Sequence, residues 1–318
     1  MRVLVAGATG VIGRRLVPLL AGTGHEVFAL ARTPDPAPPP VRPLAVDALE
    51  AADLRAAVLE AKPDAVVNLL TAIPPVIDPR RMERAFAQTN RLRTEATVTL
   101  LEAARDAGAS RIVCEGLAYA YDPAGEGPAD EDAPFWHDPP KQFATTQRAL
   151  VELEALTHAA DGLVLRLGHL YGPGTAYSPL GPDEQSPDGW ITGQIRERRV
   201  PVVGEGTAVF SFLHADDAAA AVAAALTTGV TGSLNVVDDT PTPVAEWLPA
   251  LAELLGAEPP HRVPTPLARL VTGAWGVAFF TRLRGADNTR AKAELSWRPK
   301  YASWKEGFAA DLQAAVRP

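Results

Sequence analysis

A glycine-rich turn near the N-terminus constrains the fold more than any other feature of the chain. Gly7, Gly10 and Gly13 are evenly spaced between an apolar run at Arg2–Ala6 and a helical pattern at Val11–Ala21. Glycines in such a turn let the backbone approach a pyrophosphate and let the helix pack close to the strand, while the helix N-terminus faces the anion. A second apolar run ends roughly twenty residues later, as in a dinucleotide-binding unit. The turn therefore predicts a strand, turn and helix that bind a dinucleotide.

Short apolar runs alternate with longer helical stretches through the first half of the chain. Such alternation is typical of strand–helix–strand units and a parallel sheet, whose strands read as continuously apolar because both faces are buried. We therefore predict an α/β fold, a Rossmann-type doubly wound parallel sheet with a smaller C-terminal substrate-binding lobe. The expected strands are Arg2–Ala6, Glu26–Ala31, Ala65–Leu70, Arg111–Cys114 and Leu163–Leu167. The expected helices include Val11–Ala21, ending at Gly22, and Thr89–Ala107, ending at Gly108.

The character of the chain changes after Gly168, where a Gly/Pro-rich run at 171–189 replaces the regular alternation. Residues 1–168 are predicted to form the nucleotide-binding core, completed by parts of 205–238. Residues 169–318 are predicted to form mainly the substrate lobe, interleaved with that core. The apolar stretch Leu270–Phe280 is shorter than the roughly 20 residues that span a bilayer, so we expect a buried or partly amphipathic helix.

Composition excludes several classes of partner. The formal net charge of the 318-residue chain is -8, so it offers no basic field for nucleic acid or for an anionic membrane surface. The N-terminus begins a strand and shows no export signal. The single cysteine, Cys114, excludes an internal disulfide and is expected to be a packed thiol. These features favour a cytoplasmic protein, and we expect no metal site because no His, Cys or carboxylate cluster has metal-ligand spacing.

Several further motifs occur in an order that points to one protein family. They are GHEVFAL at the expected strand Glu26–Ala31, VVNLLTA at Ala65–Leu70, LRLGHLYGPGT at the end of Leu163–Leu167, FSFLHADDAAAAV, and a C-terminal ELSWRPKYASWKEGF. With the GxxGxxG spacing, they resemble the extended short-chain dehydrogenases of the NAD-dependent epimerase/dehydratase family. The resemblance implies a nicotinamide dinucleotide cofactor and a small-molecule substrate. It also raises a homodimer as an option that no residue of this sequence decides.

The end of the second strand indicates which cofactor is preferred. NAD-binding relatives place an acidic residue there, whereas this chain has Ala31 followed by Arg32. A guanidinium can hold a 2′-phosphate that a carboxylate would repel, so we expect NADP(H), with help from Arg14. Asp47 matches the family's aspartate near the adenine, although a simple loop or cap role is an open alternative. The expected cofactor contacts are Gly7, Thr9, Gly10, Val11, Ile12, Gly13, Arg14, Arg32, Asp47, Ala48, Leu69, Leu70, Thr71, Gln147, Gly168 and His169.

The proton-donating residues that the resemblance implies are missing. Phe143 and Gln147 stand where the family has Tyr and Lys, and Gly116 and Leu117 stand where it has hydroxyl side chains. None of these four can act as the usual proton donor. The catalytic residues are therefore unknown from sequence. Other polar side chains near the expected nicotinamide site, each with an ordinary structural interpretation, are Glu115, Tyr119, Tyr121, Thr145 and His169.

A second departure from the family concerns the substrate. This chain has Phe210 and Ser211 at the positions where sugar-nucleotide enzymes of this kind usually have Arg-Asp. In those enzymes the arginine binds a diphosphate. An apolar, aromatic substrate is therefore favoured. Aromatic side chains that could line its pocket, or could simply be core, are Phe135, Trp136, Tyr171, Trp190 and Phe210.

The missing donor pair and the apolar substrate site together suggest an atypical NADPH-dependent ketoreductase that acts on a carbonyl of a polyketide-like aromatic molecule. The proton would come from the substrate's own hydroxyl or from water. In this respect the chain resembles the atypical ketoreductases of angucycline antibiotic pathways. Two alternatives remain open at this point: a non-catalytic NADP-binding sensor or regulator, and a non-redox isomerase or cyclase that uses the same cleft.

Overall fold

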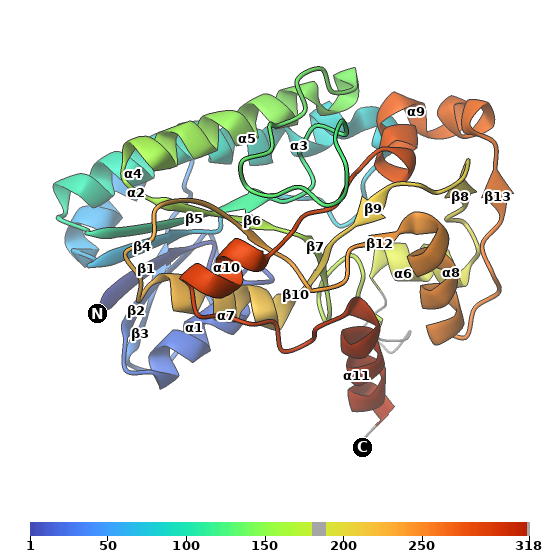
Figure 1. The fold of residues 1–318 in the computed structure, drawn as a ribbon. Coiled ribbons are helices and arrows are strands. Elements are labelled where there is room, and N and C mark those ends of the chain that lie inside the picture. Colours follow the sequence, from blue (N-terminus) through green and yellow to red (C-terminus); the bar gives the residue numbers. More distant parts are fainter. Residues whose placement is uncertain (180–188, 317–318) are drawn as a thin grey trace.

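The computed structural model describes residues 1–179 and 189–316, and its centre is a parallel sheet of seven strands (Figure 1). The strand order is β11-β6-β5-β4-β1-β2-β3. This order reverses between β1 and β4, the point at which doubly wound folds bind their ligands. The predicted α/β fold with a doubly wound parallel sheet is therefore confirmed. The strands are β1 (Arg2–Ala6), β2 (Glu26–Ala31), β3 (Val41–Ala45), β4 (Ala65–Asn68), β5 (Arg111–Leu117), β6 (Leu163–Leu167) and β11 (Gly232–Val236).

Helices cover both faces of this sheet (Figure 1). On β1, Val3 and Val5 face a core cluster shared with α1 and α7, whereas Leu4 faces a cluster shared with α2 and α4. Because successive side chains of a strand point to opposite faces, a strand covered on both sides must be apolar throughout. The helices of the two layers are α1 (Gly13–Gly22), α2 (Ala51–Ala61), α3 (Met82–Arg91), α4 (Thr97–Asp106), α5 (Lys141–Ala159) and α7 (Ala215–Ala225).

A smaller lobe lies beside the carboxyl ends of the strands (Figure 1). Three short strand pairs build it: β7 with β10, β9 with β12, and β8 with β13. Residues 180–188 of the predicted Gly/Pro-rich run lie outside the described residues. The elements of the lobe and its surroundings are β7 (His169–Tyr171), β8 (Val202–Val203), β9 (Val209–Phe210), β10 (Phe212–His214), β12 (Thr242–Pro243), β13 (Arg262–Val263), η1 (Pro79–Arg81), α6 (Trp190–Arg196), α8 (Val244–Leu254), α9 (Thr265–Thr281), α10 (Thr289–Glu294) and α11 (Trp304–Val316).

Two strand ends differ from the sequence prediction, and both differences affect the site. β4 stops at Asn68, before the expected Leu70, because the Asn68 side chain accepts a hydrogen bond from the Leu70 amide and turns the chain. β5 continues past Cys114 to Leu117 because β6 pairs with it over that length. Glu115 therefore lies within β5 and not after it.

The helix expected at Thr89–Ala107 is divided into three parts. Between α3 and α4 lies η2 (Leu92–Ala96), which is π-helical. The Thr97 hydroxyl donates to the Leu92 carbonyl five residues back and accepts from the Asn68 amide, which favours the wider turn. π-Helical turns inside α-helices often occur at functional sites.

The structure also tests several smaller predictions made from the sequence. α1 begins at Gly13 and not at Val11, and the left-handed glycine after it is Gly24 (φ 86°) and not Gly22. The apolar stretch 270–280 is helical within α9, which bends at Gly273 (φ 74°). Cys114 is buried as predicted. Among the described residues, no helix has the length and apolar character needed to span a membrane.

Candidate active site

The glycine turn is closed by backbone contacts that leave no room for side chains. A Cβ on Gly7, which has φ +91°, would lie 2.5 Å from the Leu69 carbonyl oxygen of the chain leaving β4. A Cβ on Gly13 would lie 2.3 Å from the Gly7 carbonyl oxygen. Gly10, by contrast, is exposed at the tip of the turn. The first and last glycines therefore shape the turn, and the middle one keeps its outer surface free.

The same turn presents hydrogen-bond donors without partners. No described residue accepts a hydrogen bond from the backbone amides of Val11, Ile12 or Gly13 at the start of α1. Such amides at a helix N-terminus bind an anion, and the helix dipole adds to the attraction. The residues present therefore fit the pyrophosphate of a dinucleotide. Arg15, which sequence analysis did not single out, links the turn to α7 through Asp216 and to the loop after β7 through the Pro173 carbonyl.

The end of β2 fits an extra phosphate. Ala31 is buried, and Arg32 is exposed and forms no ion pair with any described residue. The Arg14 guanidinium lies 3.8 Å from the carboxylate of Asp35, three residues after Arg32 in the chain, and both side chains are largely exposed. The Asp47 carboxylate accepts a hydrogen bond from the Leu49 amide, so at least one oxygen has a local turn role. Its contact with an adenine stays a prediction.

The positions of the missing donor pair are filled by groups that supply no proton. The Phe143 ring is 2% exposed and stacks on Trp275 of α9, with the ring centroids 4.0 Å apart and the planes at 8°. The Gln147 amide nitrogen donates to the Ala120 carbonyl at 3.2 Å. Its buried amide oxygen has no partner among the described residues and is free to accept a hydrogen bond from a ribose hydroxyl.

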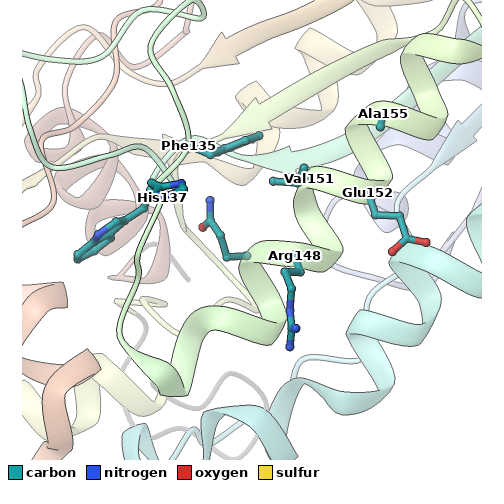
Figure 2. Close-up of a pocket in the computed structure, with 8 residues that line it drawn as sticks. Phe135, His137, Arg148, Val151, Glu152 and Ala155 are labelled. Atoms are coloured by element: carbon teal, nitrogen blue, oxygen red, sulfur yellow. The ribbon is translucent and has the colours of Figure 1, made fainter.

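A hollow of about 390 Å³ lies beside the outer side of α5 (Figure 2). Its lining residues are Phe135, Trp136, His137, Gln147, Arg148, Val151, Glu152 and Ala155. This lining includes Gln147 but no residue of the glycine turn. Phe135, predicted as a lining residue of the substrate pocket, lies over the Arg166 guanidinium at 4.7 Å.

Four polar side chains at the strand ends form what we call the strand-end cluster: Arg93 of η2, Glu115 of β5, Tyr119 after β5 and His169 of β7. The Tyr119 and His169 rings stack with their centroids 4.3 Å apart, and Arg93 interacts electrostatically with both Glu115 and Tyr119. The cluster has aromatic walls. These walls are Phe210, stacked on His169 at 3.9 Å, and Phe279 of α9, which meets Tyr119 and His169 edge-on.

The protonation states in this cluster follow from burial. Burial lowers the pKa of His169 to about 3, and its Nδ1 lies 3.2 Å from the Ser211 carbonyl, so the neutral ring donates there. Burial raises the pKa of Tyr119 to about 12. Burial also raises the pKa of Glu115 to about 7, although Arg93 opposes the shift. Within the cluster, only Glu115 can exchange a proton readily near neutral pH.

The other two polar candidates have partners elsewhere. Tyr121 donates to the Asn235 side chain and accepts from Arg166, whose guanidinium also pairs with the buried Glu154. Thr145 donates to Glu83 on an exposed part of α5. The structure therefore brings Glu115, Tyr119 and His169 together and leaves Tyr121 and Thr145 outside the cluster.

Arg93 and the aromatic residues of α9 were missed by sequence reasoning. The signal for Arg93 was a charged residue on a buried helical stripe, three residues from both Asn90 and Ala96, which are buried. Trp275 and Phe279 gave no such signal, because only the chain path brings α9 over the strand ends. Among residues 1–179 and 189–316, no three His, Cys, Asp or Glu side chains are placed to hold a metal ion.

The parallel sheet, its glycine turn and the free amides define a nucleotide-binding protein of the extended short-chain dehydrogenase class. Residues 3–237 match the sequence profile described as the NAD dependent epimerase/dehydratase family, and the chain belongs to this family. It is accordingly an NAD(P)H-binding oxidoreductase.

Sequence relatives extend over the whole chain. A Streptomyces protein named 3-diazoavenalumate denitrifying reductase is 46% identical over 311 residues, which cover 97% of this chain and 99% of that protein. The Bos taurus epimerase family protein SDR39U1 is 32% identical, over 100% of this chain and 99% of that protein.

Among solved structures, UDP-glucose 4-epimerase from Thermotoga maritima, with UDP-glucose, covers 100% of both chains with a TM-score of 0.74 at 20% identity. Human SDR39U1 with NADPH has a TM-score of 0.73 at 23% identity, covering 98% of this chain and 99% of that chain. At these identities the likeness concerns the fold.

Proposed function

We propose that this protein is an NADPH-dependent reductase of a small aromatic natural-product intermediate, and that it works without a tyrosine proton donor. The observation that carries the proposal is the Phe143–Trp275 stack, which fills the donor position with a buried apolar contact beside Phe279, one of the aromatic walls of the strand-end cluster. The choice of NADPH rests on Ala31 and Arg32, which lack a carboxylate and offer a guanidinium.

The acceptor that this site fits best needs no proton from the protein. A positioned general acid contributes typically 100- to 10,000-fold to a carbonyl reduction, and the Phe143 position has none. A diazonium group on an aromatic ring avoids this loss. It takes one hydride, with its two electrons, from bound NADPH; the C–N bond then breaks, and the products are the arene, N₂ and NADP⁺. The name of the 46% identical relative, a denitrifying reductase of a diazo compound, supports this acceptor class.

An aromatic ketone with a neighbouring hydroxyl is the second candidate. Its intramolecular hydrogen bond polarises the carbonyl, and its hydroxyl can give the proton as the hydride arrives, which yields the alcohol. Glu115 favours this candidate, because a carboxyl with a pKa of about 7 can return the proton to the substrate oxygen. Resemblance to the angucycline ketoreductases, including the simocyclinone enzyme, supports the same chemistry.

Parallel assays of the two acceptor classes test the proposal. Purified protein is mixed with NADPH and either 3-diazo-4-hydroxybenzoate or 2′-hydroxyacetophenone, and NADPH consumption, N₂ release and deuterium transfer from labelled NADPH are measured. We expect transfer of deuterium to the ring with release of N₂. Transfer only to the ketone would select the second candidate. Tight NADPH binding with no transfer to either probe would favour a sensor, and conversion without NADPH would favour an isomerase or cyclase.

A further inference from the structure

Arg93 is a buried cation that forms no hydrogen bond or ion pair with any described residue. Arg93 belongs to the π-helical η2 and is 2% exposed, and its buried Nη1 has no hydrogen-bond acceptor in the part of the chain that the structure describes. Arg93 and Glu115 attract each other electrostatically, yet no ion pair joins Arg93 to any described carboxylate. Buried arginines are almost always paired or hydrogen-bonded, as Arg166 is with Glu154 in the same protein. The lone guanidinium therefore points to a ligand.

Other buried polar atoms that lack a partner among the described residues lie on α3, α5 and β7. Ten buried side-chain atoms lack a partner among the described residues, and four of them belong to Asn90, Arg93, Gln147 and His169. Three of these four are acceptors: the amide oxygens of Asn90 and Gln147, and Nε2 of His169, whose Nδ1 donates to the Ser211 carbonyl. Only Arg93 supplies a cationic donor. The site is therefore suited to a ligand that carries one negative charge.

The aromatic side chains near Arg93 indicate what the uncharged part of the ligand is. Tyr119, which interacts electrostatically with Arg93, belongs to a stack of flat rings with His169 and Phe210, and Phe279 meets this stack edge-on. Aromatic walls favour a flat aromatic guest, and exclusion of water strengthens a charge-assisted hydrogen bond. We infer that Arg93 binds an anionic oxygen, a phenolate or carboxylate, carried by the aromatic substrate. This deepens the proposed function, on which it rests for the aromatic substrate class.

Binding of unreactive probes to the NADP⁺-loaded protein tests this inference without turnover. The carboxylate probe is 4-methoxycinnamate, the phenolate probe is 4-nitrophenolate, and the neutral control is 4-nitroanisole. Isothermal titration calorimetry should show that at least one anion binds. Arg93→Met should weaken that anion on the order of 10- to 100-fold, as for loss of a hydrogen bond to a charged group, and should leave the neutral probe unchanged.

Two further variants separate a binding role from a structural one. Arg93→Lys keeps the charge and should recover part of the affinity, while Arg148→Met, at an exposed arginine on α5, should change nothing. If Arg93→Met does not fold, Arg93→Lys still tests the role of Arg93. Relative to the parent protein, this variant should bind the anion more weakly and the neutral probe equally well. Unchanged anion binding in both Arg93 variants, equal losses for the neutral probe, or no anion binding by the parent would overturn the inference. Failed NADPH turnover with Arg93-dependent binding would overturn the proposed function alone.

Discussion

Restoring the family's tyrosine should not restore the family's chemistry. The Phe143 ring is 2% exposed and lies 4.0 Å from the Trp275 ring, so the hydroxyl of Phe143→Tyr would enter a sealed apolar contact. A buried hydroxyl without a partner costs about 1–3 kcal/mol, and we expect the free energy of unfolding to fall by that amount. Adding Gln147→Lys places an ammonium where the amide now donates to a carbonyl, and burial disfavours its charged form.

Single-turnover hydride transfer, followed by NADPH absorbance, measures the effect on rate. With the diazo probe we expect less than about a threefold change for either variant, against the 100- to 10,000-fold that a general acid contributes where a proton is needed. Urea unfolding measures the stability loss in parallel. Phe143→Leu is the matched control, since it removes the stack without adding a hydroxyl. A gain of about 100-fold or more in the tyrosine variant would refute the reasoning, because it would show that the reaction awaits a protein proton.

Three further predictions concern the cofactor turn and the strand-end cluster. Arg32→Ala should reduce the preference for NADPH over NADH by about 10-fold or more, since a charge-assisted hydrogen bond is lost; fluorescence titration with both cofactors checks this. Gly10→Val should abolish NADPH binding but leave the urea unfolding midpoint nearly unchanged, because the residue is exposed. Affinity for 4-methoxycinnamate should fall as pH rises through about 7, where Glu115, which faces Arg93 and Tyr119, becomes charged and competes for the guanidinium; calorimetry of Glu115→Gln should show no such fall.

The strands of the sheet could be predicted because the apolar character of each strand is visible in its own residues. A strand buried on both faces must be apolar along its length, so β1, β2 and β6 could be placed from composition alone. Strand ends depend on neighbours instead. β4 ends where the Asn68 side chain captures the amide of Leu70, and β5 extends because β6 pairs with it, and neither effect is visible in the strand's own residues.

The site divides in the same way. The glycine turn and the absence of the donor pair follow from residue identity at fixed spacing, so sequence analysis could describe both. The burial of Arg93 depends on how α3, η2 and the sheet pack, and the cover over Phe143 comes from Trp275, more than a hundred residues away in the chain. Contacts of that kind require the path of the whole chain, which periodicity does not supply.

Arg93 and the missing proton donor can be explained by the same property of the proposed diazo substrate. When a diazo group lies next to a ring oxygen, the molecule is a resonance hybrid. One form is a neutral quinone diazide, and the other carries a phenolate and a diazonium group. A guanidinium at the oxygen stabilises the negative charge and so favours the diazonium form, the better hydride acceptor. Arg93 in aromatic surroundings could act in this way, whereas a tyrosine at position 143 would have nothing to protonate. Arg93→Met should therefore lower the rate of hydride transfer at saturating diazo probe as well as its affinity, and a loss confined to affinity would show that the arginine holds the substrate without activating it.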